Sequence, residues 1–316
     1  MVDLQDVRKA HSRIRDRVVR TPVMTSTTLD RLTSCQVFLK CENFQRVGAF
    51  KFRGALNTVS QLSSAERERG VITHSSGNHA QALALAASME GVKATIVMPK
   101  NSPQVKVNAT RDYGAEIVFC ENSSEARAKV ANDLIEKHNY TLVHPYDDER
   151  IIAGAGTSAL ELIEDVESID YMLAPVGGGG LLSGTSIATK GLCPEATVIA
   201  VEPEKADDAY RSFRAGTLFP SIYPDTIADG LRTQLSELTF EIIQQNVDDI
   251  ITVSEKEIVD AMRFLWERMK MVVEPSGAVS LAGFLKMKDE ITDKRVGIIL
   301  SGGNIDLTDF FEKYTH

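Results

Sequence analysis

Short apolar segments alternate with longer segments of helical periodicity through most of this 316-residue chain, and that alternation limits the fold more than any other feature. The apolar segments have the length of strands and lie at Val71–Thr73, Ala94–Val97, Ile117–Phe119, Thr141–Val143, Tyr171–Val176, Thr197–Val201, Ile250–Val253 and Val296–Leu300. The helical segments lie at 78–89, 103–112, 124–137, 151–165, 255–269 and 277–288, with one more after residue 180. Because strands that alternate with helices form parallel sheets covered on both faces, the sequence predicts an α/β fold.

The beginning of the chain and one long internal segment depart from the regular alternation. An amphipathic helix is predicted over 3–19, a short strand over 37–40, and a helix from Lys51 to about Leu62. Residues 203–236 contain three prolines and no regular pattern. A loop of that length in a compact enzyme is often functional.

We expect two α/β domains, because the chain is longer than one domain usually is. The smaller domain comprises residues 69–147. It is inserted into a larger domain formed by residues 1–68 and 148–316.

Charge, hydropathy and cysteine content argue against several classes of function. The net charge of −9 disfavours nonspecific binding to nucleic acids and to anionic membranes. No stretch approaches 18 uninterrupted apolar residues, and the charged N-terminus does not resemble a signal peptide. The four cysteines form no C-x-x-C pair. We therefore expect a cytoplasmic protein with reduced thiols, no membrane partner and no nucleic-acid partner.

Four consecutive glycines, Gly177, Gly178, Gly179 and Gly180, follow a predicted strand and precede Leu181 at the start of a helix. A tight turn needs one or two glycines, whereas four let the backbone N–H groups approach an anion closely. The positive end of the helix dipole adds to that attraction. No Gly-Lys-Ser/Thr sequence follows, so the run is not a Walker loop. It predicts a phosphate site.

Lys51 is the candidate nucleophile because a phenylalanine flanks it on each side. Most lysines in such positions only lay their aliphatic stems on a surface. An apolar setting, however, lowers the pKa of an amine and lets it attack a carbonyl. Pyridoxal 5'-phosphate (PLP) carries both an aldehyde and a phosphate, so Lys51 and the glycine run together predict a PLP enzyme.

Two further polar segments follow predicted strands. Ser75–His79 comes after the strand at 71–73, and Ser301–Asn304 comes after the last strand. In the first segment Ser76 or Asn78 could simply cap the next helix, or the helix N-terminus could bind a carboxylate. Because parallel strands bind ligands at their carboxyl ends, we expect both segments and the glycine run to line one crevice.

An acidic segment, Glu202–Asp208, follows the strand at 197–201. Such segments usually form a solvated surface. Their carboxylates and a backbone carbonyl would also suit Mg²⁺ or Ca²⁺.

These motifs resemble the serine/threonine dehydratase family of fold type II PLP enzymes, and the resemblance covers essentially the whole chain. It implies a tryptophan synthase β-like fold with two open, twisted parallel-sheet α/β domains and the active site between them. Within the family, the chain is most similar to the members that racemise serine. The residues that carry this closer similarity are Glu202, Ala206–Tyr210, Thr226–Gly230 and Trp266–Pro275.

The resemblance implies a role for each candidate site residue. Lys51 binds PLP covalently and moves the proton on one face of the substrate Cα, and Ser76 moves it on the other face. The cofactor-binding residues are Lys51, Phe50 against the ring, Asn78 at the 3′ oxygen, Gly177, Gly178, Gly179, Gly180 and Leu181 at the phosphate, and Ser301 at the pyridine nitrogen. The substrate carboxylate is bound by Ser75, Ser76, Asn78 and His79. A divalent cation (Mg²⁺, Ca²⁺ or Mn²⁺) is bound by Glu202, the carbonyl of Ala206, and Asp208.

The implied activity is racemisation of serine, accompanied by elimination of water to give pyruvate and ammonia. Ala49 and Tyr146 instead resemble threo-3-hydroxyaspartate dehydratases. An ammonia-lyase acting on threo-3-hydroxyaspartate or L-threonine is therefore the alternative, with Arg127 as a candidate for binding a second carboxylate. A non-catalytic nucleotide-binding regulatory protein is an alternative from a different class.

The resemblance also implies a homodimer whose interface binds ATP as an allosteric activator. The residues that fit this expectation are Gln81, Tyr113, Lys270 and Asn304. Arg46 and Val47 depart from the lysine and threonine expected in the animal enzymes.

Overall fold

The computed structural model describes residues 2–75, 77–102 and 104–307, which form two sheets. The larger sheet has the order β1 (Val23–Met24), β2 (Gln36–Cys41), β10 (Arg295–Leu300), β7 (Tyr171–Pro175), β8 (Thr197–Pro203), β9 (Asp249–Val253). The smaller has the order β5 (Glu116–Cys120), β4 (Ala94–Pro99), β3 (Val71–His74), β6 (Thr141–Leu142). Only β1 pairs antiparallel with its neighbour; the other pairings are parallel. The predicted α/β class is confirmed.

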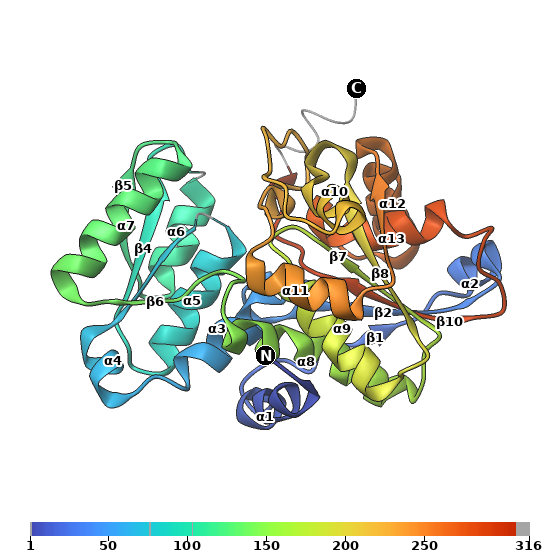
Figure 1. Cartoon of the computed structure of the whole chain (residues 1–316), viewed down its shortest axis with the longest axis horizontal. Helices are drawn as coiled ribbons and strands as arrows, with labels where there is room; N and C mark the ends of the chain where they lie inside the picture. The colour runs from blue at the N-terminus through green and yellow to red at the C-terminus, as the bar shows by residue number, and fades with distance from the viewer. Residues whose placement is uncertain (1, 76, 103, 308–316) are drawn as a thin grey trace.

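Helices cover both sheets, and the two sheets lie side by side (Figure 1). The α-helices are α1 (Leu4–Ile14), α2 (Thr27–Thr33), α3 (Lys51–Val59), α4 (Ser64–Arg69), α5 (Asn78–Met89), α6 (Gln104–Asp112), α7 (Ser124–His138), α8 (Glu149–Val166), α9 (Gly180–Leu192), α10 (Asp208–Ala215), α11 (Glu237–Asn246), α12 (Glu255–Met269) and α13 (Pro275–Lys286). The 3₁₀ turns are η1 (Glu42–Phe44), η2 (Arg46–Gly48), η3 (Glu204–Ala206) and η4 (Asp229–Leu231). The smaller sheet draws only on residues 71–142 and the larger on residues 23–41 and 171–300. The domain limits at 68 and 147 stay a prediction.

The expectation of an irregular segment over 203–236 is wrong in part. It contains α10, and the turns η3 and η4. Three prolines obscured the helical pattern, although the acidic start of α10 suits a helix N-terminus. The short helices α2 and α4 and the helix α11 were also missed. Each follows a serine whose side chain accepts a main-chain N–H: Ser26, Ser63 and Ser236.

Glycines let three central helices approach one another closely. A Cβ on Gly154 of α8 would lie 2.7 Å from the carbonyl oxygen of Arg53 in α3. A Cβ on Gly184 of α9 would lie 2.3 Å from the carbonyl oxygen of Ile152 in α8. Both distances are shorter than contact, so α3, α8 and α9 pack backbone to backbone. This packing sets the position of the first turn of α3, where Lys51 lies.

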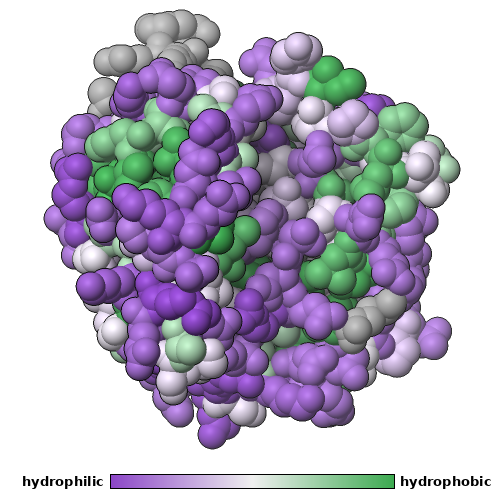
Figure 2. Space-filling view, turned by 60° about the vertical axis from the view of Figure 1, so that its left-hand side comes forward, coloured by the Kyte–Doolittle hydropathy of each residue, from purple (hydrophilic) through white to green (hydrophobic). Residues whose placement is uncertain are grey.

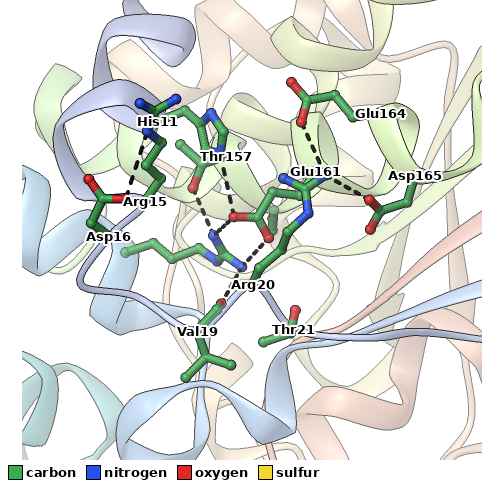
Figure 3. A network of polar contacts seen from close by, with 12 residues as sticks. His11, Arg15, Asp16, Val19, Arg20, Thr21, Thr157, Glu161, Glu164 and Asp165 are labelled. Atoms are coloured by element: carbon green, nitrogen blue, oxygen red, sulfur yellow. Dashed lines mark hydrogen bonds and ion pairs between the residues drawn. The ribbon is translucent and has the colours of Figure 1, made fainter.

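A fully buried ion network ties α3 to the larger sheet and to α8. Arg53 donates to both carboxylate oxygens of Glu42 at 2.7 and 2.8 Å, and to both oxygens of Glu161 at 2.8 Å. Lys40 donates to Glu161 at 2.8 Å and to the carbonyl of Thr21 at 2.7 Å. Figure 3 shows the Glu161 end of this network, beside Val19 and Thr21. The two positive charges of the network cancel its two negative charges, and the paired hydrogen bonds offset the loss of hydration.

None of the helices in the described part of the chain has the length and hydropathy that crossing a bilayer requires. The face shown in Figure 2 is mostly hydrophilic, with hydrophobic side chains gathered in separate patches.

We predict that Arg53→Met lowers the free energy of unfolding by about 3–5 kcal/mol, because it leaves Glu42 and Glu161 buried with too little positive charge. Urea unfolding followed by circular dichroism measures the loss. Lys129→Met is the matched control, since Lys129 pairs with Asp133 on the surface and is 75% exposed. Equal midpoints for the two variants would contradict a structural role for the network.

Candidate active site

Lys51 begins α3 beside the end of the last strand. Phe50 donates its N–H to the carbonyl of Ser301 at 3.0 Å, and Ala49 forms a bridge with Gly302. The Lys51 ammonium donates to the carbonyl of Pro145 at 2.8 Å and lies 5.0 Å from the centre of the Phe50 ring. The side chain keeps some accessible surface, yet protein atoms enclose the amine. Burial lowers the pKa of Lys51 to about 8, against the opposing charge of Glu274.

The glycine run joins β7 to α9 and has no room for side chains. A Cβ on Gly178 would lie 2.3 Å from the Tyr146 ring, and one on Gly177 would lie 2.9 Å from Cα of Leu231. Gly179 has φ +87°, in the left-handed region that favours glycine. Gly180 begins α9, so the N–H groups of that first turn have no partner within the helix. Such a cradle at a helix N-terminus fits a phosphate.

Asn78, at the first position of α5, connects three parts of the site. Its amide nitrogen donates to Glu274 at 2.8 Å, and its oxygen accepts from Asn304 at 2.9 Å. Asn304 also donates to the carbonyl of Val47 at 2.6 Å. The second hydrogen of the Asn78 amide is left for another acceptor, which suits the predicted contact with the 3′ oxygen.

His79 cannot bind a carboxylate through its ring in the neutral state. Its Nε2 lies 3.0 Å from the carbonyl of Val143, which can only accept, so the ring proton is on Nε2. Burial lowers the pKa of His79 to about 3, and its buried Nδ1 is an acceptor with no partner among the described residues. A carboxylate at this helix end would instead meet the main-chain N–H groups of the first turn of α5.

Two predicted cofactor residues meet beside Lys51, since the Phe50 N–H donates to the Ser301 carbonyl. Ser301 is buried, and its hydroxyl lies 3.4 Å from the carbonyl of Ser276. Ser75 accepts the N–H of Gly77 at 3.3 Å, just before α5. Ser76 lies outside the described residues.

The acidic segment forms a separate buried group at the end of β8. Glu202 accepts the N–H groups of Ala209 at 3.0 Å and Tyr210 at 2.8 Å, and burial raises its pKa well above the usual range. Asp208 is also buried, and neither of its oxygens has a partner at ordinary hydrogen-bond geometry among the described residues, although Ser221 is near enough to lower its pKa in part. Burial raises the pKa of Asp208 to about 6. Ala206 is buried in the turn between them.

The buried oxygens of Asp208 are a donor type that a divalent cation would accept as ligands. Within the described residues no three His, Cys, Asp or Glu side chains gather as metal ligands. The predicted set is consistent with this, since its third ligand is the main-chain carbonyl of Ala206. The remaining ligands would be water molecules.

Glu274 and His144 are site residues that sequence reasoning missed. Glu274 is buried, and burial, with the charge of Asp229 adding to it, raises its pKa to about 8. Pro275 at the first position of α13 was a usable signal, because it marks Glu274 as the residue before a helix at the crevice. His144 lies next to Pro145, whose carbonyl accepts from Lys51; no local pattern marked it.

A cavity of about 440 Å³ lies elsewhere, over the outer side of the ion network. It is lined by His11, Arg15, Asp16, Arg20, Glu161 and Glu164. None of these is a predicted site residue, and we assign it no part in the chemistry.

A lysine of lowered pKa at the start of α3, a glycine turn that fits a phosphate, and two largely parallel sheets are together typical of a PLP enzyme of the α/β class. The family model described as "Pyridoxal-phosphate dependent enzyme" matches residues 14–302, and the chain belongs to that family.

The relatives narrow the class further. The L-threo-3-hydroxyaspartate ammonia-lyase of Saccharomyces cerevisiae is 52% identical over 303 residues, which are 96% of this chain and 93% of that protein. The serine racemase of Dictyostelium discoideum is 48% identical over 311 residues, 97% of this chain and 96% of that protein. A crystal structure of serine racemase from that organism has a TM-score of 0.93 and covers 97% of this chain and 99% of its own. The predicted family and fold are confirmed, and the chain is a PLP-dependent enzyme of the racemase and ammonia-lyase type. The non-catalytic alternative is not supported.

We predict that Glu274 makes the apoprotein less stable as pH rises from about 4.5 toward 8. Its pKa is raised by folding, so the native state keeps a proton that the unfolded state has released, and unfolding becomes easier by up to about 1.4 kcal/mol per pH unit in that window. Glu274→Gln, which keeps an oxygen for Asn78, should flatten the slope measured by urea unfolding. Glu68→Gln on the surface is the control. A slope unchanged by Glu274→Gln would mean that Glu274 is already ionised.

Proposed function

We propose that the chain is a PLP-dependent serine racemase that also eliminates water from serine to give pyruvate and ammonia. The observation that carries the proposal is the enclosed Lys51 amine, which is held between Pro145 and the Phe50 ring. With its pKa brought to about 8, the amine can exchange protons near neutral pH. The relatives named as serine racemase support the choice of substrate.

Lys51 has two tasks in this proposal. It holds PLP covalently, and it takes and returns the proton on one face of the substrate Cα. When bound, PLP delocalises the electron pair that proton removal leaves on Cα. We assign the opposite face to Ser76 on the family resemblance alone. A proton delivered from that side inverts the centre, whereas loss of the β-hydroxyl leads to pyruvate and ammonia.

The residues around Lys51 support the assigned PLP contacts. The ring of PLP is assigned to Phe50, the 3′ oxygen to Asn78, and the pyridine nitrogen to Ser301. The phosphate is assigned to the N–H groups of Gly177, Gly178, Gly179, Gly180 and Leu181. The substrate carboxylate is assigned to Ser75, Ser76, and the main chain at Asn78 and His79, since the His79 ring has no proton to donate there.

A dehydratase of threo-3-hydroxyaspartate is the second candidate. The ammonia-lyase of Saccharomyces cerevisiae supports it. Arg127 is close enough to His74 that its charge, after burial, contributes to lowering the pKa of that histidine. A cation at this position would favour a substrate with a second carboxylate. L-Threonine, with an apolar methyl group there, gains nothing from it.

We predict that wild-type protein binds PLP with a yellow colour and that borohydride fixes the cofactor on Lys51. Lys51→Ala should lose racemisation and elimination alike, by several orders of magnitude. Chiral analysis of L-serine turnover, with pyruvate measured alongside, gives both rates. Comparing kcat/KM for L-serine, L-threonine and L-threo-3-hydroxyaspartate then ranks the substrates. A preference of orders of magnitude for hydroxyaspartate would reject serine as the main substrate.

We also propose a divalent cation at Glu202, the Ala206 carbonyl and Asp208. We predict that millimolar Mg²⁺, Ca²⁺ or Mn²⁺ stabilises the protein, by about 2.7 kcal/mol at one hundred times the dissociation constant. Thermal unfolding with each cation and with a chelator measures the effect. Asp208→Asn should abolish it, whereas Asp225→Asn, at a 91% exposed acid farther along the 203–236 segment, should keep it. A cation effect retained in Asp208→Asn would place the ion elsewhere.

A homodimer, ATP binding and a cytoplasmic location complete the proposal. Phe44 and Val272 expose 48% and 46% of their surface, and Asn43 joins the two segments by donating to the Val272 carbonyl at 3.2 Å. Such an apolar patch suits a second copy of the chain.

ATP is assigned to Gln81, Tyr113, Lys270 and Asn304. The four free cysteines suit a reducing compartment. Sedimentation with and without ATP tests the dimer and the nucleotide together.

A further inference from the structure

We propose that His144 is a specificity-determining residue, whose imidazole presents a fixed N–H donor to the β-substituent of the substrate and thereby favours a β-carboxylate. The inference rests on the proposed PLP chemistry of the site, and it bears on the choice between the two candidate substrates, serine and threo-3-hydroxyaspartate. It concerns a residue that neither the motifs nor the family resemblance assigned.

His144 is the sequence neighbour of the residue that binds the Lys51 amine. It follows β6, the neighbour of β3, and the next residue, Pro145, accepts the hydrogen bond of Lys51 at 2.8 Å. The charge of Lys51 contributes, after burial, to lowering the pKa of His144. The imidazole is half-buried, so part of it remains accessible.

The main chain determines which ring nitrogen carries the proton. Nδ1 of His144 lies 2.8 Å from the N–H of Asp147, and that N–H can only donate. Nδ1 must therefore accept, and the proton of the neutral ring is on Nε2. Burial lowers the pKa of His144 to about 4, so the ring is neutral at physiological pH.

Neighbouring rings hold this donor in place. The His144 ring meets Tyr146 edge-on with centroids 4.6 Å apart, and meets His74 in the same manner at 6.4 Å. Tyr146 is itself pressed against Gly178 of the phosphate cradle. The ring of His144 thus lies between the end of β3 and the glycine run. Among the described residues no hydrogen bond is formed by Nε2, and the His144 side chain is half-buried.

A fixed N–H donor distinguishes the candidate substrates by chemistry. A carboxylate accepts a charge-assisted hydrogen bond, which is stronger than the neutral bond to a hydroxyl. The methyl group of threonine accepts none. Loss of a hydrogen bond to a charged group lowers binding by roughly 10- to 100-fold, and loss of a neutral one by a smaller factor.

Two substitutions at His144 test its Nε2 N–H donor separately from the hydrogen bond that Nδ1 accepts from Asp147 in the loop. His144→Asn places an oxygen near Nδ1, which keeps the bond from Asp147, but it has no group at the Nε2 position. His144→Gln places an amide N–H near Nε2 and gives up the loop contact. Both are made in the holoenzyme, and thermal unfolding shows that each remains folded.

For His144→Asn, kcat/KM for L-threo-3-hydroxyaspartate should fall by roughly 10- to 100-fold, and for L-serine by a smaller factor. His144→Gln should recover part of the loss. An equal fall for hydroxyaspartate, serine and threonine would overturn the proposal, because His144 would then only shape the loop.

A binding measurement keeps this test independent of turnover. Succinate and butyrate differ by one carboxylate, so inhibition or calorimetric titration of holoenzyme with each isolates that group. His144→Asn should weaken succinate by roughly 10-fold or more and leave butyrate nearly unchanged. Failure of serine turnover would reject the proposed function alone. Equal weakening of succinate and butyrate would reject the role of His144.

Discussion

The doubly bidentate pairing of Arg53 with Glu42 and Glu161 is the interaction on which the rest of the structure depends. Both carboxylates and Lys40 are buried with it, so each charged group needs its partners to offset the hydration that it loses. The network joins β2, η1 and α8 to the third residue of α3. Lys51 is the first residue of that helix, two positions earlier. Charge pairing deep in the larger sheet therefore determines where the reactive amine lies.

The site then forms where parallel strands end. Ser301 follows β10, Gly177 follows β7, and Ser75 follows β3, so predicted site residues that are far apart in sequence all stand at the carboxyl ends of strands. Main-chain carbonyls accept two of the hydrogen bonds that position the site. The Ser301 carbonyl accepts from Phe50, and the Pro145 carbonyl accepts from Lys51. Backbone positions vary less than side-chain rotamers, and such sites are correspondingly rigid.

Local patterns in the sequence predicted the features that depend on local physics. The start of α5 at Asn78 and the glycine turn before α9 were anticipated, because capping, dipole and backbone freedom act over a few residues. Other features depend on distant partners. Glu161 meets Arg53 across 108 residues, and Glu274 is buried against Asn78 across 196. The ring proton of His144 depends on a main-chain bond that no composition or spacing reveals. α10 was missed because prolines beside it hid its period.

The similarity of this chain to proteins of two different names has a physical reason. It is 52% identical to a hydroxyaspartate ammonia-lyase and 48% identical to a serine racemase over nearly the same length. In the proposed function, the ion network, the phosphate cradle and the enclosed lysine would serve the step that both reactions share, which is removal of the Cα proton. They cannot choose between substrates that differ only beyond Cβ. We propose that the choice comes from side chains at the edge of the site, among them His144 and Tyr146 beside Pro145, and Arg127 near His74.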